Sequence, residues 1–198
     1  VAGTNFGTGT SMTFTAGVAS ASMILYKAES AAVNASDGTI NSNTGGTLNV
    51  TVGSSTMTKL AVSLASPQIN GTAFTGTNTL TAQDAYGNTV TTFNAATNNV
   101  TVTTSLTGTI TGFTGGDVIQ GAGEFVNGVA NLTTKLTFTV TSGTGTFTFT
   151  PATGTGVTSS TITINSGAAT KLVITGTGTQ TAGVAQTITI TAKDASGN

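Results

Sequence analysis

Apolar and polar residues alternate in short runs along this chain, and Gly, Asn and Ser separate the runs. A period of two places successive side chains on opposite faces of an extended backbone, so we expect each run to be a strand that buries one face. Six runs in residues 58–169 show the pattern: Lys59–Leu64, Asn78–Gln83, Asn99–Thr103, Thr134–Val140, Thr146–Thr150 and Thr161–Ile164. Their apolar positions are the candidate core: Leu60, Val62, Leu64, Leu80, Ala82, Val100, Val102, Leu136, Phe138, Val140, Phe147, Phe149, Ile162 and Ile164.

The chain also contains an internal repeat. The segment Thr79–Asn88 (TLTAQDAYGN) returns nearly unchanged as Thr189–Asn198 (TITAKDASGN). Further matches have the same spacing: Lys59 and Leu60 with Lys171 and Leu172, and Phe14, Gly17, Val18 and Leu25 with Phe125, Gly128, Val129 and Leu136. All of these offsets fall between 110 and 112 residues.

A repeat of this length corresponds to one independently folded domain, because the units of solenoids and propellers are much shorter. The repeat divides the chain into the C-terminal half of one module (1–57), a complete module (58–169) and the first strands of a third module (170–198). A chain cut within its repeats is expected to come from a longer parent chain. The helix-like stretch Ala28–Ser36 aligns with strand and loop of the complete module, so we expect a strand followed by a loop there.

Composition favours an all-β fold. Thr makes up about a quarter of the chain, far above its usual frequency. Thr, Val, Ile and Phe suit the half-buried surface of a sheet, whereas the strong helix formers Glu, Lys, Arg and Gln are scarce. About seven or eight strands in a module of this length predict an immunoglobulin-like sandwich of two antiparallel sheets. A parallel β-helix is the alternative, although its short coil repeat is not visible.

Low charge argues against several functions. The chain has five Lys and Arg, six Asp and Glu, no His and no Cys, and its formal net charge is −1. It has no basic stripe for nucleic acid and no polybasic segment for anionic lipid. The longest apolar run, Met23–Tyr26, is too short to cross a bilayer. Catalysis and zinc or iron binding usually need His or Cys, so we expect no enzyme, no catalytic residue and no cofactor-binding residue.

The repeated sequence Asp-Ala-Tyr/Ser-Gly-Asn predicts a structural turn. One copy uses Asp84, Gly87 and Asn88, and the other uses Asp194, Gly197 and Asn198. The Asp carboxylate can cap such a turn, and Gly supplies the positive φ that closes it. Calcium binding by Asp84 is the functional alternative, but calcium takes about six to eight oxygen ligands and no acid lies near Asp84 in the sequence.

Asp117 lies on the Gly-rich stretch Thr114–Gly123 and Glu124 directly follows it, and these two are the other candidate carboxylates. A glycosidase pair would need a defined separation and a cleft, and a calcium site would need more ligands. A solvated loop is the simpler interpretation. We therefore expect no metal ion, with calcium at Asp117 and Glu124 as a weak alternative.

Two other functions remain open. Tyr86, at the tip of the turn, could stack on a sugar, and glycan binding that Tyr86→Ala abolishes would identify a secreted glycan-binding module. Alternatively, if residues 1–57 and 170–198 are whole ends, each is an incomplete sandwich whose unpaired edges invite another chain. A small subunit would then polymerise by strand complementation, although counterparts of Thr89–Ile110 would be missing.

Two segments resemble a known family. TITAKDASGN, preceded by TKLVITGTGTQTAGVAQ, and MILYKAESAAVNASDGTI are similar to the tandem immunoglobulin-like (Big-type) repeats of giant bacterial surface adhesins, such as the gliding-motility adhesins of Bacteroidota. The resemblance implies a secreted, extracellular chain whose repeats form a stalk, surface filament or surface-layer component. Its expected partners are neighbouring repeats, other copies in a filament or lattice, and surface glycans. The resemblance carries no catalytic residue over to this chain.

Overall fold

The structure, a computed structural model, is all-β. It describes residues 11–43 and 45–198, which form strands, turns and bends, so this part of the chain has no helix that could span a membrane. The N-terminal part (11–57) contains β1 (Ser30–Val33) and β2 (Leu48–Thr51), and the C-terminal hairpin (170–198) contains β15 (Lys171–Gly176) and β16 (Ile188–Lys193). The central module (58–169) lies between them.

The central module contains twelve strands. They are β3 (Lys59–Ser63), β4 (Gln68–Ile69), β5 (Thr79–Gln83), β6 (Val100–Thr104), β7 (Gly108–Thr111), β8 (Val118–Ile119), β9 (Val129–Asn131), β10 (Thr137–Val140), β11 (Gly143–Gly145), β12 (Phe147–Pro151), β13 (Val157–Thr158) and β14 (Ile162–Asn165).

Two antiparallel sheets enclose the core of the central module. One sheet has the order β3-β5-β9, and the other has the order β13-β12-β6-β8. Two smaller sheets, β10-β7 and β11-β14-β4, complete the module, and only the contact of β14 with β4 is parallel among these pairs. The antiparallel sandwich is therefore confirmed, and the parallel β-helix is wrong.

A single apolar cluster fills the space between the sheets. Leu80 from one sheet and Phe149 from the other are both fully buried in it. Phe147 makes edge-to-face contacts with two further rings, Phe74 at a centroid distance of 5.4 Å and Phe138 at 5.9 Å. Such aromatic pairs add about 0.5–1.5 kcal/mol each beyond the burial of their surface.

The alternating runs located the main strands, with two corrections. Each of the six runs overlaps a strand, with bounds that differ by a few residues. However, the module has twelve strands instead of the expected seven or eight. The larger number arises because several strands are only two to four residues long and are separated by turns. Val140, expected in the core, is 43% exposed, and its φ is +108°. It lies where the module meets the C-terminal hairpin. Its carbonyl accepts a hydrogen bond from Asn198 there, and its side chain is not part of the core.

The two flanking parts repeat pieces of the central module. In the hairpin, β15 and β16 pair antiparallel with Leu172 opposite Ala192. The β3–β5 pair has the equivalent register, with Leu60 opposite Ala82. At the other end, the stretch Ala28–Ser36 contains the strand β1, which pairs with β2, followed by a loop, as expected.

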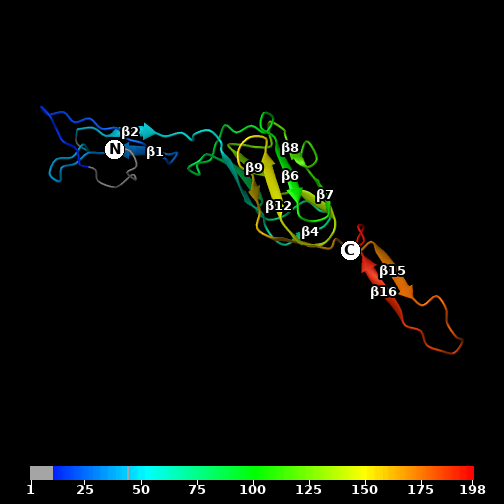
Figure 1. The fold of residues 1–198 in the computed structure, drawn as a ribbon. Helices are drawn as coiled ribbons and strands as arrows, with labels where there is room; N and C mark the ends of the chain where they lie inside the picture. The colour runs from blue at the N-terminus through cyan, green and yellow to red at the C-terminus, as the bar shows by residue number, and fades with distance from the viewer. Residues whose placement is uncertain (1–10, 44) are drawn as a thin grey trace.

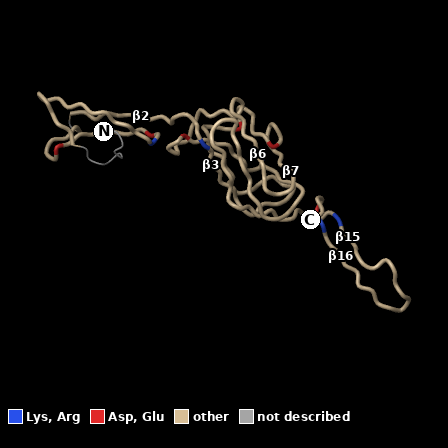
Figure 2. Tube along the Cα trace, viewed as in Figure 1, with Lys and Arg blue, Asp and Glu red and all other residues tan. Residues whose placement is uncertain are grey.

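The three parts follow one another along the molecule (Figure 1), with the N-terminal part and the C-terminal hairpin at opposite ends. Figure 2 shows that the few charged residues gather mainly near the places where the parts meet, leaving long uncharged stretches of chain between them. Most of the few charged residues of this chain therefore lie near the two junctions.

We predict that Leu80→Ala lowers the free energy of unfolding of the central module by about 2–5 kcal/mol, because the side chain is completely buried. Ile190 occupies the equivalent position of β16 but is 57% exposed, so Ile190→Ala should change stability by less than about 0.5 kcal/mol. Urea unfolding of the dilute chain measures both values. Equal losses in the two variants would contradict the assignment of the core.

Candidate functional site at the repeated turns

The first repeated turn follows β5 and is organised by the buried carboxylate of Asp84. Oδ1 accepts hydrogen bonds from the backbone N–H of Tyr86 and of Asn88, each at 2.9 Å. Oδ2 accepts one from the side-chain amide of Asn88 at 2.9 Å and one from the N–H of Ser55 at 3.0 Å. Gly87 has a φ of +87°, which favours glycine. One carboxylate thus ties its own turn to residues 52–58, the connecting segment between β2 and β3.

The second turn, after β16, is built in the same way around Asp194. Its carboxylate accepts hydrogen bonds from the N–H of Asn198 at 2.9 Å and from the Asn198 side-chain amide at 3.0 and 3.1 Å. It also accepts one from the N–H of Gly167 at 2.9 Å, in residues 166–170, the connecting segment between β14 and β15. Gly197 has a φ of +95°, and its carbonyl accepts a hydrogen bond from the ammonium group of Lys193.

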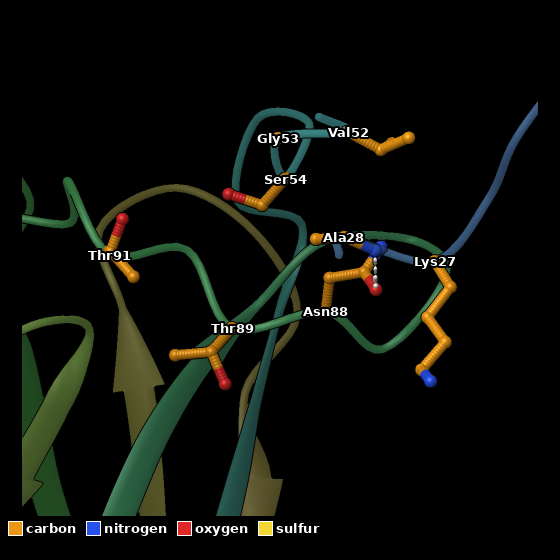
Figure 3. Close-up of a pocket in the computed structure, with 8 residues that line it drawn as sticks. All are labelled: Lys27, Ala28, Val52, Gly53, Ser54, Asn88, Thr89 and Thr91. Atoms are coloured by element: carbon orange, nitrogen blue, oxygen red, sulfur yellow. Dashed lines mark hydrogen bonds between the residues drawn. The ribbon is translucent and has the colours of Figure 1, made fainter. Parts of the chain in front are cut away.

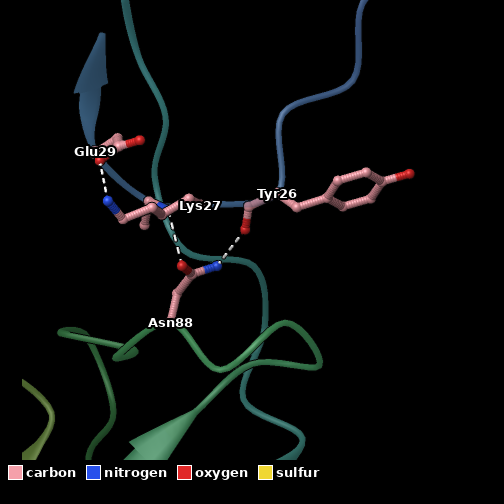
Figure 4. Close-up of polar contacts among 5 residues, drawn as sticks. Tyr26, Lys27, Glu29 and Asn88 are labelled. Atoms are coloured by element: carbon pink, nitrogen blue, oxygen red, sulfur yellow. Dashed lines mark hydrogen bonds and ion pairs between the residues drawn. The ribbon is translucent and has the colours of Figure 1, made fainter. Parts of the chain in front are cut away.

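At the first junction, the Asn of the turn grips the backbone of the preceding part of the chain. Asn88 Oδ1 accepts a hydrogen bond from the N–H of Ala28 at 2.8 Å, and its Nδ2 donates to the carbonyl of Tyr26 at 2.7 Å. Figure 4 shows the amide placed between these two backbone groups, beside the ion pair of Lys27 with Glu29. Because the amide presents a donor and an acceptor side by side, it satisfies both groups at once.

At the second junction, Asn198 makes the same pair of contacts with the central module. Its Oδ1 accepts a hydrogen bond from the N–H of Ser142 at 3.0 Å, and its Nδ2 donates to the carbonyl of Val140 at 3.1 Å. In both junctions the two gripped residues are two positions apart in the sequence. We call this arrangement of Asp, Asn and the gripped backbone the Asp–Asn clamp.

The third residue of the turn differs between the two junctions, and so do its contacts. Tyr86 packs against Tyr26 with a ring-centroid distance of 4.7 Å, and both rings remain partly exposed. Ser196 replaces Tyr86 in the second turn, where its hydroxyl donates a hydrogen bond to Oδ1 of Asn70 at 3.3 Å. The same backbone clamp is therefore accompanied by an aromatic contact at the first junction and by a side-chain hydrogen bond at the second.

A shallow groove of about 440 Å³ lies beside the first clamp (Figure 3). Three segments line it: residues 27–28 of the N-terminal part, residues 52–54 of the connecting segment, and Asn88, Thr89 and Thr91 of the central module. The lining offers amide, hydroxyl and ammonium groups. These polar groups lie at the junction between the N-terminal part and the central module.

Hydrogen bonding keeps the pKa of both turn carboxyls low. Burial raises the pKa of Asp84, but the side-chain amide of Asn88 and three backbone N–H groups outweigh it and lower the pKa from the ordinary 3.8 to about 2. At Asp194, the side-chain amide of Asn198 lowers the pKa against the effect of burial, again to about 2. Both carboxylates are therefore ionised at neutral pH and act only as acceptors.

The structure does not bring Asp117 into the hydrogen-bond network of Glu124. Glu124 Oε1 accepts a hydrogen bond from the N–H of Thr114 at 2.9 Å, and Oε2 accepts from the N–H groups of Gln120 and Gly121, each at 2.7 Å. Burial raises the pKa of Glu124, and these N–H groups lower it to a value below its ordinary one. Glu124 thus stabilises its own loop, while the Asp117 residue is exposed.

Among residues 11–43 and 45–198, no group of three or more His, Cys, Asp or Glu is placed to hold a metal ion. Glu124 would have to give up backbone hydrogen bonds to coordinate calcium, and its loop offers few other carboxylates. Calcium binding by Asp117 and Glu124 remains a weak hypothesis.

Comparisons with known proteins add little to this geometry. No protein-family model matches the chain, and no curated protein matches it. One solved structure with similarity to the chain is that of domains 4-9 of the surface layer protein SbsC, with 22% sequence identity and a TM-score of 0.37. The match covers 81% of this chain and 23% of the SbsC structure, so the chain spans about a quarter of that structure's length.

We predict that acid loosens both clamps. Because the folded pKa of Asp84 and Asp194, about 2, lies below the ordinary 3.8, the ionised carboxylates stabilise the turns above about pH 4. This stabilisation is lost as the pH falls from about 4 through about 2. The NMR signals of the Tyr86 and Asn88 amides should titrate with a midpoint near 2, and this titration should vanish in Asp84→Asn while that of the second turn persists. A midpoint near 3.8 would contradict the clamp geometry.

Proposed function

We propose that this chain is a segment of a tandem array of β-sandwich modules that acts as a semi-rigid structural element on the bacterial cell surface. The array would serve as an adhesin stalk, a surface filament or a component of a surface layer. Its role is mechanical, and no residue of the chain is proposed to be catalytic. The observation that carries the proposal is the Asp–Asn clamp, which occurs at both junctions with the same donors and acceptors.

The clamp restrains a junction through three separate segments. Asp84 binds the connecting segment at Ser55, while Asn88 binds the preceding part at Tyr26 and Ala28. Because the bonded groups are backbone atoms of the N-terminal part and of the linker itself, a bend at the junction breaks several hydrogen bonds together. This arrangement favours a stiff connection over a flexible one.

The rest of the chain is compatible with prolonged exposure outside a cell. It contains only five Lys and Arg residues, which are the cleavage sites of trypsin-like proteases, and no Cys that could be oxidised. Thr covers many outward positions of the strands, as in β6 and β12. These features support an extracellular structural role, and the resemblance to Big-type adhesin repeats points the same way.

A glycan-binding module is the second candidate, and one observation favours it. Tyr26 and Tyr86 form a pair of partly exposed rings beside the groove at the first junction. Exposed aromatic rings can stack on sugars. However, the two rings pack on each other, and the second junction has no tyrosine, so the pair stabilises one junction instead of defining a site repeated along the array.

We predict that Asn88→Ala makes the first junction flexible. The substitution removes the bonds to Tyr26 and Ala28 and should shift the docking equilibrium by on the order of 2 kcal/mol. The chain has no Cys, so spin labels can be placed at Ala32→Cys in β1 and Thr109→Cys in β7. The distance distribution between the labels should be narrow in the parent chain and broad in Asn88→Ala.

The matched control for this experiment is Asn131→Ala. Asn131 also caps a turn of the central module, through the N–H of Thr133 at 3.0 Å, but it lies outside the clamp. Its removal should leave the label distribution narrow. An equally broad distribution in the parent chain and in both variants would show that the clamp does not stiffen the junction.

We also predict that antibodies raised against residues 58–169 label intact cells of the organism that produces the chain. Permeabilising the cells should add little to the signal, because the array is expected on the outer surface. A cytoplasmic protein labelled in parallel serves as the control for membrane integrity. Labelling that requires permeabilisation would overturn the proposed location and leave the mechanical role of the junctions untouched.

A further inference from the structure

The central module binds the turn of the part that follows it through three of its own segments. Asn70 directly follows β4, residues 140–142 lie at the end of β10, and Gly167 lies shortly after β14. All three contact the turn Asp194–Asn198 through hydrogen bonds. We call these three segments the socket. The turn that enters the socket belongs to the next repeat of the chain.

Asn70 is the buried side chain of the socket. Its Nδ2 donates to the carbonyl of Thr141 at 2.7 Å, between the two residues whose backbone Asn198 binds. Its backbone N–H donates to the carbonyl of Asn165 at 2.8 Å, and only 4% of the residue is exposed. The amide is therefore held in place by the central module itself, and Oδ1 cannot turn away without breaking the bond to Thr141.

The Oδ1 atom of Asn70 is the acceptor for the third residue of the turn. It accepts a hydrogen bond from the hydroxyl of Ser196 at 3.3 Å, and no other described residue donates to it. A buried acceptor that loses its donor incurs the cost of desolvation without compensation, and this cost exceeds the usual net contribution of a hydrogen bond. A successor without a donor at this point is therefore penalised by the socket.

The turn of the central module itself lacks such a donor. Its third residue is Tyr86, which packs on Tyr26 of the preceding part at a ring-centroid distance of 4.7 Å. The Asp, Ala, Gly and Asn positions are identical in the two turns, so the third residue is their one difference. The hydroxyl of a tyrosine lies on the far side of its ring and cannot take the position of the Ser196 hydroxyl. The module's turn thus does not match its own socket.

We propose that Asn70 selects the module that follows. The socket accepts a turn with a small hydroxyl residue in third place and disfavours a turn with Tyr, so the central module disfavours a copy of itself as its successor. The backbone contacts of the clamp are common to both junctions, and the third residue adds the discrimination between successors. The inference rests on the proposed tandem array and identifies the partner of one junction, a module with the turn Asp-Ala-Ser-Gly-Asn.

Hydrogen exchange of the Ser142 amide tests the selection. This N–H donates to Oδ1 of Asn198 at 3.0 Å, so it exchanges when the turn leaves the socket. Ser196→Tyr keeps the donors and acceptors of the clamp and reproduces the central module's own turn. We expect it to raise the exchange rate of Ser142 by on the order of tenfold. Ser196→Thr, which keeps the hydroxyl, should exchange like the parent chain.

Two controls separate selection from damage to the fold. Ala195→Tyr places the same ring at the preceding, exposed position of the turn, and should leave the exchange of Ser142 unchanged. The N–H of Phe74 donates to the carbonyl of Leu136 at 2.8 Å inside the central module, and should exchange equally slowly in every variant. In Ser196→Tyr the Asn198 amide should still titrate with Asp194, whose pKa is about 2, because the turn itself stays intact.

A double-mutant cycle ties the effect to Asn70. Asn70→Ala and Ser196→Ala remove the two sides of one hydrogen bond, so the double variant should exchange no faster at Ser142 than Asn70→Ala alone. Effects that multiply, or exchange that Ser196→Tyr leaves unchanged, would overturn the selection and leave the clamp intact. A Ser142 amide that is unprotected in the parent chain would contradict the clamp and the selection together.

Discussion

A buried carboxylate that accepts hydrogen bonds from two parts of the chain is the constraint on which this structure depends. Asp84 and Asp194 are almost completely buried, and each would be costly to bury as an unpaired charge. Each carboxylate is satisfied only when the turn, the turn's own Asn and the connecting segment are all in place. The charge therefore couples the local conformation of a five-residue turn to the arrangement of neighbouring modules.

The sequence was sufficient to predict the fold class, and the reason is physical. The alternation of Leu80 with Ala82, or of Phe147 with Phe149, has the period of a strand with one buried face, and nothing in the composition favours a helix. Short strands such as β4, β8 and β13 were not foreseen, because two residues are too few to show a period. Val140 was assigned to the core because its residue type fits the pattern, but the junction needs its carbonyl.

The candidate site was predicted only in part. The turn chemistry of Asp84 and Gly87 follows from residue type, since Asp side chains cap turns and Gly adopts positive φ. The hydrogen bonds of Asn88 to Tyr26 and Ala28 could not be predicted, because Asn88 is about sixty positions away from both residues in the sequence. The bonded groups of Tyr26 and Ala28 are backbone atoms, which every residue type carries. The repeat of Asn at the end of both turns was the available signal, and it was interpreted as turn propensity alone.

Taken together, the clamps and the continuous repeat describe an array in which each module is fixed to the one before it. Residual dipolar couplings of the aligned chain at neutral pH test this account most directly, because they report the relative orientation of its parts. The account predicts that couplings from residues 28–57 and from residues 58–169 fit one alignment tensor. Couplings that require two tensors of different magnitude would show that the modules move independently and would contradict the clamped array.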